Sequence, residues 1–267
     1  MDLRAEYEIA SQTDPGRKRR GGPNQDAILV LPADAQRGMP PLLAVADGMG
    51  GHVGGAVASA KVIEAIAGHY NQARQGADML LLLGECLQAA LDALHRHAAG
   101  EPSLATMGST IVLGVVTDGQ VWVANVGDSR AYTIHGRVMT QVSFDHSFVA
   151  EQVRLGIITP LQARTHPRRN RLTQSLSPKR ASFKPHICQV PFEKDDTLLL
   201  CSDGLWGVIP EAVIQAVAND LPPQEAVGKL VDLALTSGGP DNISVIIARR
   251  KDAQPARFFG TGDKTGG

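Results

Sequence analysis

Five aspartates stand where short apolar runs begin or end, and most of them adjoin glycine or a turn that contains glycine. Asp47 ends the run LLAVAD, Asp203 ends LLLCSD, and Asp128 follows VWVANVG. Asp26 and Asp241 stand just before other apolar runs. One such aspartate is usually a turn former or a helix cap. Five of them indicate carboxylates delivered to one rim of a sheet, where a metal would have to relieve their mutual repulsion.

The chemistry of the candidate ligands favours a hard divalent cation. The ligands are carboxylate and carbonyl oxygens, and no cysteine–histidine grouping accompanies them. Oxygen ligands suit Mg²⁺ or Mn²⁺, whereas structural zinc sites use sulfur and imidazole nitrogen. The glycines that follow Asp47 and Asp203 would let backbone carbonyls and waters approach an ion closely. The sequence therefore predicts a magnesium or manganese centre.

The composition is that of an ordinary globular chain. The 267 residues are 43% hydrophobic and 20% charged, and a formal net charge of -1 gives no field that favours nucleic acid or an anionic membrane. The N-terminus lacks an apolar signal core, and the longest apolar run is too short to span a bilayer. Three cysteines without a C-x-x-C pair are typical of a reducing setting, so we expect a cytoplasmic protein.

The spacing of apolar residues predicts runs of strands and pairs of helices along the chain. Residues 53–74 and 77–98 have helical spacing, and the buried stripe of the second helix would be Leu80, Leu83, Leu87, Leu91 and Leu94. Strand-like runs separated by DG and GD turns predict a β-meander in residues 109–136. Two amphipathic helices, in residues 210–220 and 222–239, precede a last strand. Without regular strand–helix alternation, the pattern favours an α+β fold of antiparallel sheets covered by helices.

Eight short motifs then occur in a familiar order. They are NQDA (24–27), VADGMGGH (45–52), GST (108–110), ANVGDSRAY (124–132), DHS (145–147), HPRRNRLTQSL (166–176), LLLCSDGLW (198–206) and GGPDNISVI (238–246). In this order the chain resembles the metal-dependent protein phosphatases of the protein phosphatase 2C type, in their compact bacterial form. The motifs extend over almost the whole chain, and eight of them in register are a specific signal.

This resemblance implies an antiparallel β-sandwich of two sheets flanked by helix pairs, as α-β-β-α layers, with a binuclear metal site at one end. It implies a single catalytic domain over residues 1–251 and a flexible tail over 252–267. Residues 143–180 would form the flap that lies beside the site in such enzymes.

The resemblance also assigns ligands to two tightly bound ions, which would be Mn²⁺ or Mg²⁺. In such enzymes the aspartate of VADG binds both metals, so that role falls on Asp47. The backbone carbonyl of Gly48 would bind the second ion, and Asp203 and Asp241 would hold the first.

Three more residues receive roles by the same resemblance. Asp26 would orient metal-bound water, and Asp128 together with Asp203 would hold a third, weaker ion. Asn242 would support Asp241 without touching the metal. The implied reaction is hydrolysis of phosphoserine or phosphothreonine in proteins by a hydroxide that the two ions share. A cysteine-based mechanism is excluded, because no cysteine here begins a C-x5-R motif.

The basic loop RKRRGGP departs from the family pattern. Relatives carry an arginine three residues before the asparagine of NQD, where it binds the substrate phosphate, but that place is Gly21 here. A bulge in the glycine turn would let Arg20 reach the site, with Arg19 as the second choice, while the alternative is a solvated basic loop. Met49 stands where animal relatives have the histidine proposed as general acid, as it does in bacterial forms.

Two functions from different classes stay open at this point. One is an active phosphatase that opposes a Ser/Thr protein kinase, and the other is an inactive relative that binds phosphoproteins as a scaffold. Loss of Asp47, Asp203 or Asp241 would favour the scaffold, and because all three are present the sequence favours the enzyme. We expect a monomer that acts on phosphorylated proteins and binds neither nucleic acid nor membrane.

Overall fold

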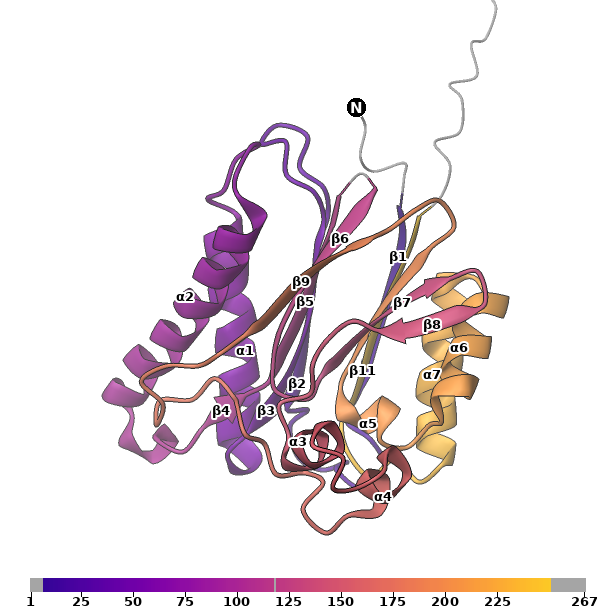
Figure 1. Cartoon of the computed structure of the whole chain (residues 1–267). Coiled ribbons are helices and arrows are strands. Elements are labelled where there is room, and N and C mark those ends of the chain that lie inside the picture. The colour runs from indigo at the N-terminus through magenta and orange to yellow at the C-terminus, as the bar shows by residue number, and fades with distance from the viewer. Residues whose placement is uncertain (1–6, 118, 251–267) are drawn as a thin grey trace, which may run out of the picture.

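The computed structural model describes residues 7–117 and 119–250, which form four layers (Figure 1). Two antiparallel sheets pack face to face. A helix pair covers the outer face of each sheet. This arrangement confirms the predicted α+β class and the sandwich flanked by helix pairs. The predicted flexible tail, 252–267, lies outside the described residues.

The first sheet has the order β2-β3-β5-β6-β9, and the short β4 pairs with β3. Strands β3 and β5 are almost entirely buried, because one face meets a helix pair and the other meets the second sheet. The strands of this sheet are β2 (Asp26–Leu31), β3 (Leu42–Met49), β4 (Gly108–Ser109), β5 (Ile111–Thr117), β6 (Gln120–Val126) and β9 (His186–Pro191).

The second sheet has the order β1-β11-β10-β7-β8. The first and last strands of the described chain lie side by side in it, with Tyr7 opposite Arg250 and Asp14 opposite Ile243. This pairing ties the two ends of the domain together. The strands are β1 (Tyr7–Asp14), β7 (Arg130–His135), β8 (Val138–Gln141), β10 (Thr197–Cys201) and β11 (Ile243–Arg250).

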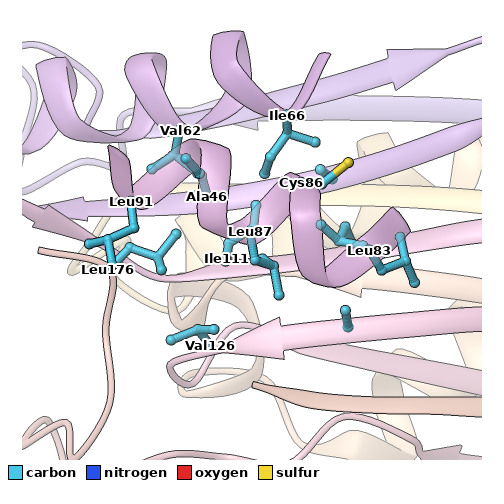
Figure 2. Close-up of a cluster of buried hydrophobic side chains, with 14 of the residues drawn as sticks. Ala46, Val62, Ile66, Leu83, Cys86, Leu87, Leu91, Ile111, Val126 and Leu176 are labelled. Carbon is cyan, nitrogen blue, oxygen red and sulfur yellow. The ribbon is translucent and has the colours of Figure 1, made fainter. Parts of the chain in front are cut away.

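The predicted helices form with slightly shifted ends, as α1 (Gly51–Tyr70), α2 (Met79–Gly100), α6 (Glu211–Asp220) and α7 (Pro223–Thr236). Figure 2 shows the buried side of α2 packed with α1 over the first sheet. Asp78 caps α2, since its side chain accepts a hydrogen bond from the backbone N–H of Leu81. The predicted stripe was wrong at Leu80, which is exposed, and Leu82 is buried in its place.

The segment 143–180 contains two short helices, α3 (Phe148–Arg154) and α4 (Pro160–Thr165). Figure 1 draws them beyond the ends of the sheets, at the same end as the one-turn helix α5 (Asp203–Trp206). The 3₁₀ turn η2 (Pro102–Leu104) joins α2 to β4. Among the described residues, no helix combines the length and the apolarity needed to cross a membrane.

Gly48, directly after Asp47, lies in very close backbone packing. A Cβ atom added to it would lie 1.9 Å from the carbonyl oxygen of Gly55 in α1 and 2.8 Å from that of Gln25. The Gly48 N–H also donates to the Gln25 carbonyl, at 3.0 Å. The sequence suggested that this glycine makes room for an ion, and the structure adds a second reason, since any side chain here would collide with backbone.

We expect Gly48→Ala to lower the midpoint of thermal unfolding in metal-free buffer, because relieving the overlap requires a backbone shift that costs about 1–3 kcal/mol. Gly84→Ala in α2 is the matched control, since no neighbouring atom lies within 4 Å of its added Cβ. That change should stabilise the helix by about 0.5–1 kcal/mol. A Gly48→Ala protein as stable as the wild type would contradict the packing described here.

Candidate metal centre

Strand pairing places two of the aspartates opposite each other. Strands β2 and β3 are antiparallel, and their register sets Asp26 directly across from Asp47. Directly opposed residues in an antiparallel pair have Cβ atoms about 4.5–5.5 Å apart. The end of the first sheet therefore holds two adjacent carboxyl groups.

The second sheet brings the other three to the same end. Asp203 opens α5 just after β10, and Asp241 precedes β11, which pairs with β10. Asp128 lies in the turn that leads from β6 into β7, the other neighbour of β10. Because β7 and β11 flank β10, the loops that carry these residues emerge side by side.

Electrostatic interactions join Asp47 to each of the other four aspartates. Desolvation, reinforced by these charges, raises the pKa of Asp47 well above its usual range. Burial likewise raises the pKa of Asp26 to about 7, that of Asp203 to about 6, and that of Asp128 well above its usual range. In the absence of a cation, the protein thus resists full ionisation of this cluster.

Asp26 has an oxygen that a partner could still occupy. Its Oδ2 accepts a hydrogen bond from Ser202 Oγ at 2.7 Å, and Ser202 Oγ accepts one from the Ser244 N–H at 3.0 Å. Its Oδ1 is buried and has no hydrogen-bond partner among the described residues. A buried acceptor without a partner costs about 1–3 kcal/mol. This orphaned oxygen fits a site completed by an ion or its water.

The donors around the cluster fit Mn²⁺ or Mg²⁺. All of the candidate ligands are carboxylate or backbone carbonyl oxygens, the chemistry that these ions prefer. Within the described residues no three acidic, histidine or cysteine side chains form a ready-made cage. Mg²⁺ is usually bound through one or two carboxylates and keeps several waters, so such a cage is not required.

Cationic side chains from two loops face the cluster. The guanidinium of Arg19 lies 3.0 Å from Asp241 Oδ2, with both side chains partly exposed. The charges of Arg19 and Arg169 partly offset the rise in the pKa of Asp203. Arg169 belongs to the segment 143–180, so this segment lies near the aspartates. Sequence reasoning preferred Arg20, but the loop arginine that contacts an aspartate here is Arg19.

Asn242 connects the loop of Asp241 to the loop that precedes β2. Its Oδ1 accepts from the Gln25 N–H at 2.9 Å, and its Nδ2 donates to the Pro15 carbonyl at 2.9 Å. These bonds hold the two loops together, and the supporting role of Asn242 stays a prediction. Sequence reasoning did not single out Gly16, which has a φ of 72° and where a Cβ would lie 1.9 Å from the Asp241 carbonyl oxygen. The PG dipeptide that contains it was the available signal.

Thr110, outside the acidic set, fixes the backbone of Asp47, and Ser129 in turn contacts Thr110. Thr110 Oγ1 accepts from the Asp47 N–H at 3.1 Å, and the Thr110 N–H donates to the Asp47 carbonyl at 2.8 Å. The hydroxyls of Thr110 and Ser129 lie 2.7 Å apart, which links this strand end to the loop of Asp128. The motifs GST and GDSR contain these residues, but nothing in their spacing predicts this contact.

The aspartates line none of the hollows described on the surface. Two shallow hollows of about 370 and 310 Å³ lie along α1 and α2 and are lined by residues such as Lys61, Arg96, His69 and Glu85. Their walls mix charged and apolar side chains and include none of the five aspartates of the cluster. The chemistry therefore points to the rim at the strand ends and not to these two hollows.

Comparisons with known proteins identify the family of the chain. The family model described as Protein phosphatase 2C matches residues 14–242. The serine/threonine phosphatase stp of Listeria innocua is 33% identical over 253 residues, which cover 92% of this chain and 97% of that protein. Serine/threonine protein phosphatase PstP of Mycobacterium tuberculosis is 35% identical over 207 residues, which are 78% of this chain and 40% of PstP.

Solved structures give the same result. A crystal structure of the Mycobacterium tuberculosis phosphatase PstP/Ppp has a TM-score of 0.83 and 32% identity, and the match covers 92% of this chain and 100% of that one. A structure of the PstP catalytic domain in complex with 2 manganese ions has a TM-score of 0.81 and 31% identity, covering 92% and 99%. The chain therefore belongs to the protein phosphatase 2C family of metal-dependent Ser/Thr phosphatases.

Proposed function

We propose that this chain hydrolyses phosphoserine and phosphothreonine in proteins, with the aspartate cluster as its metal-binding and catalytic centre. The observation that carries the proposal is the convergence of five acidic side chains from two sheets, four of which have pKa values raised by burial and by neighbouring carboxylates. Such a cluster suits divalent cations. Family membership supplies the reaction class that a cation site of this kind would serve.

The ligand roles follow from the place of each residue. Asp47 would bind both tight ions, with the Gly48 carbonyl on one of them and with Asp203 and Asp241 on the other. Asp47 suits the shared role because it interacts with all of the other aspartates. Asp128, which interacts most strongly with Asp203 among charged groups, would hold a third and weaker ion with it.

The bound ions would supply an activated water and offset charge on the phosphoryl oxygens. Asp26, with one oxygen held by Ser202 and the other without a partner among the described residues, would orient that water. Asn242 would hold the loop of Asp241 in place through its bonds to Gln25 and Pro15.

Arg19 is the better candidate for binding the substrate phosphate, with Arg20 as the alternative. Its guanidinium already lies at the cluster, and its side chain is 42% exposed, so an incoming phosphate could reach it. A planar guanidinium can donate two parallel hydrogen bonds to phosphate oxygens. The arginine at the site would thus be Arg19, one position before Arg20, which the sequence suggested.

The substrates would be phosphorylated proteins, and a Ser/Thr protein kinase would be the opposing enzyme. Three cysteines without disulfides, two of them buried, support a reducing cytoplasmic setting.

Metal dependence tests the proposed function. With Mn²⁺ or Mg²⁺ the protein should dephosphorylate a phosphothreonine peptide, and EDTA should abolish this activity. Asp47→Asn should abolish turnover because the shared ligand loses its charge, while Asp232→Asn, an exposed change on α7, should leave turnover intact. A wild type that binds the phosphopeptide without hydrolysing it in Mn²⁺ would favour the scaffold function instead.

The raised pKa values predict how pH affects the stability of the metal-free protein. A carboxyl group with a raised pKa stabilises the fold while it is protonated, so this contribution is present below its unfolded pKa and is lost as the pH rises through its folded pKa. For Asp26 the window runs from 3.8 to about 7, and for Asp203 from 3.8 to about 6. Thermal unfolding in EDTA should therefore show stability falling across this range.

Asp47→Asn should flatten that pH dependence and raise the unfolding midpoint near neutral pH, because it removes one of the repelling charges. Asp232→Asn serves again as the control and should follow the wild type. A wild type whose metal-free stability rises steadily from acidic to neutral pH would show that the carboxylates do not repel one another as described.

The loop arginines can be separated by single substitutions. A charge-assisted hydrogen bond contributes about 1.5–3 kcal/mol, so Arg19→Ala should lower kcat/KM by about ten- to a hundredfold. Arg19→Lys should recover part of this loss, because lysine keeps the charge and not the planar fork. Arg17→Ala, an exposed change in the same loop, should have little effect. If Arg20→Ala is impaired and Arg19→Ala is not, the assignment to Arg19 is wrong.

A further inference from the structure

Arg130, the first residue of β7, has an almost buried guanidinium in which every nitrogen has a partner. Its side chain is 14% exposed. Nε and Nη2 donate to the Asp145 carboxylate, the shortest of these bonds being 2.7 Å. Nη1 donates to Tyr132 Oη and to Glu211 Oε1, both at 2.9 Å. A guanidinium held on all sides in this way has little freedom to move.

The face of the same guanidinium stacks on Trp206. Its Cζ atom lies 3.6 Å from the centroid of the Trp206 ring. A cation over the face of an indole is attracted by the ring quadrupole, most strongly where water is excluded. Arg130 therefore fixes the position of the Trp206 ring as well as that of Asp145.

Trp206 carries this constraint to the metal centre in two ways. Its Nε1–H donates to the backbone carbonyl of Asp128, at 3.0 Å. It is also the last residue of α5, which Asp203 opens. The Trp206 indole thus contacts the loop of Asp128, and Trp206 belongs to the same helical turn as Asp203. These two aspartates are the proposed ligands of the weak ion.

A second tether joins the same loop to the start of the segment 143–180. The Gly127 N–H donates to His146 Nδ1 at 3.1 Å, and the His146 N–H donates to the Gly127 carbonyl at 2.9 Å. Asp145, the neighbour of His146, is the main partner of Arg130. Arg130 therefore connects the turn of Asp128, the turn of Asp203 and the start of this segment.

We propose that Arg130 is a positioning residue that acts through Trp206 to set the distance between Asp128 and Asp203, and so determines how tightly the third, weaker cation binds. The inference rests on the proposed function, which assigns that ion to these two aspartates. The hydrogen bonds of the Arg130 side chain go to Asp145, Tyr132 and Glu211, none of which is a proposed metal ligand. Its effect should appear in binding of the weak ion and not in that of the two tight ions.

Three substitutions test the separate links. Arg130→Met removes the charge and the fork, while Trp206→Phe keeps an aromatic ring under Arg130 but deletes the N–H that Asp128 accepts. Arg249→Met is the matched control, since Arg249 is a half-buried arginine of the same sheet and its bonds go to Thr197, Ala218 and Leu221, away from the five aspartates. Asp128→Ala supplies the reference for complete loss of the weak ion.

Two readouts separate positioning from folding. Calorimetric titration with Mn²⁺ alone counts tight and weak ions, and Mg²⁺ titration in a Trp122→Phe background follows the fluorescence of Trp206. Groups that orient metal ligands typically change metal affinity by about 10–100-fold, so in Arg130→Met and Trp206→Phe the half-saturating concentration of the weak ion should rise by about tenfold or more. The tight ions should bind as in the wild type. In Arg130→Met, Mg²⁺ should also change Trp206 fluorescence only at the raised concentrations.

The activity data should agree with the binding data. In Arg130→Met and Trp206→Phe, the loss of kcat at low Mn²⁺ should be recovered at high Mn²⁺, with KM for the phosphopeptide little changed. Arg249→Met should lose stability without any shift in metal dependence.

The inference is overturned if Trp206→Phe binds the weak ion as the wild type does. It is also overturned if Arg249→Met shifts weak-ion binding as much as Arg130→Met, since the effect would then come from general destabilisation. If the wild type itself binds no weak ion, or if Asp128→Ala retains it, the assignment of the third ion fails and this inference fails with it, while the two-ion phosphatase stands.

Discussion

The mutual repulsion of the aspartates at one end of the sandwich is the constraint on which the rest of the structure depends. Asp26 and Asp47 are opposed across one strand pair, and Asp47 also interacts with the three aspartates of the second sheet. Unscreened carboxylates in partly dry surroundings would separate if the chain allowed it. The packed layers do not allow it, because the sheets that carry the two groups share a buried apolar core. The hydrophobic core thus stores an unfavourable electrostatic arrangement that divalent cations can relieve.

Neutral hydrogen bonds supply the precision that the charges themselves cannot. Thr110 holds both backbone groups of Asp47, Ser202 holds one oxygen of Asp26, and Asn242 ties the Asp241 loop to the start of β2. None of these partners carries a charge, so they hold the strand ends and loops that carry the carboxyl groups without neutralising the carboxylates. A site that binds ions needs ligands that are both oriented and still charged. Neutral hydrogen-bond partners orient the ligands, and the carboxylates keep their charge.

Two arginines near the cluster, Arg130 and Arg19, are held in different ways. Arg130 is held by Asp145 and Glu211 and stacked on Trp206, so its charge is balanced before it can collapse onto the metal ligands. Arg19 is partly exposed and pairs with Asp241 directly, which leaves it able to exchange that partner for another anion. The buried Arg130 is therefore held in one position, whereas the partly exposed Arg19 is able to change its partner.

The sequence by itself determined the fold class, the acidic set and its preference for hard cations, because these depend on residue types and on short motifs that are local. It missed β9, an edge strand of half-buried and exposed residues, and it placed Leu80 on the buried stripe of α2. Only the tertiary structure decided that Arg19 contacts Asp241, that Gly48 and Gly16 are needed for backbone packing, and that Arg130 reaches the Asp128 loop through Trp206. Apart from the approach of Gly48 to the nearby Gly55, these contacts join segments far apart in the chain. They depend on sheet order and loop geometry, which local spacing does not encode.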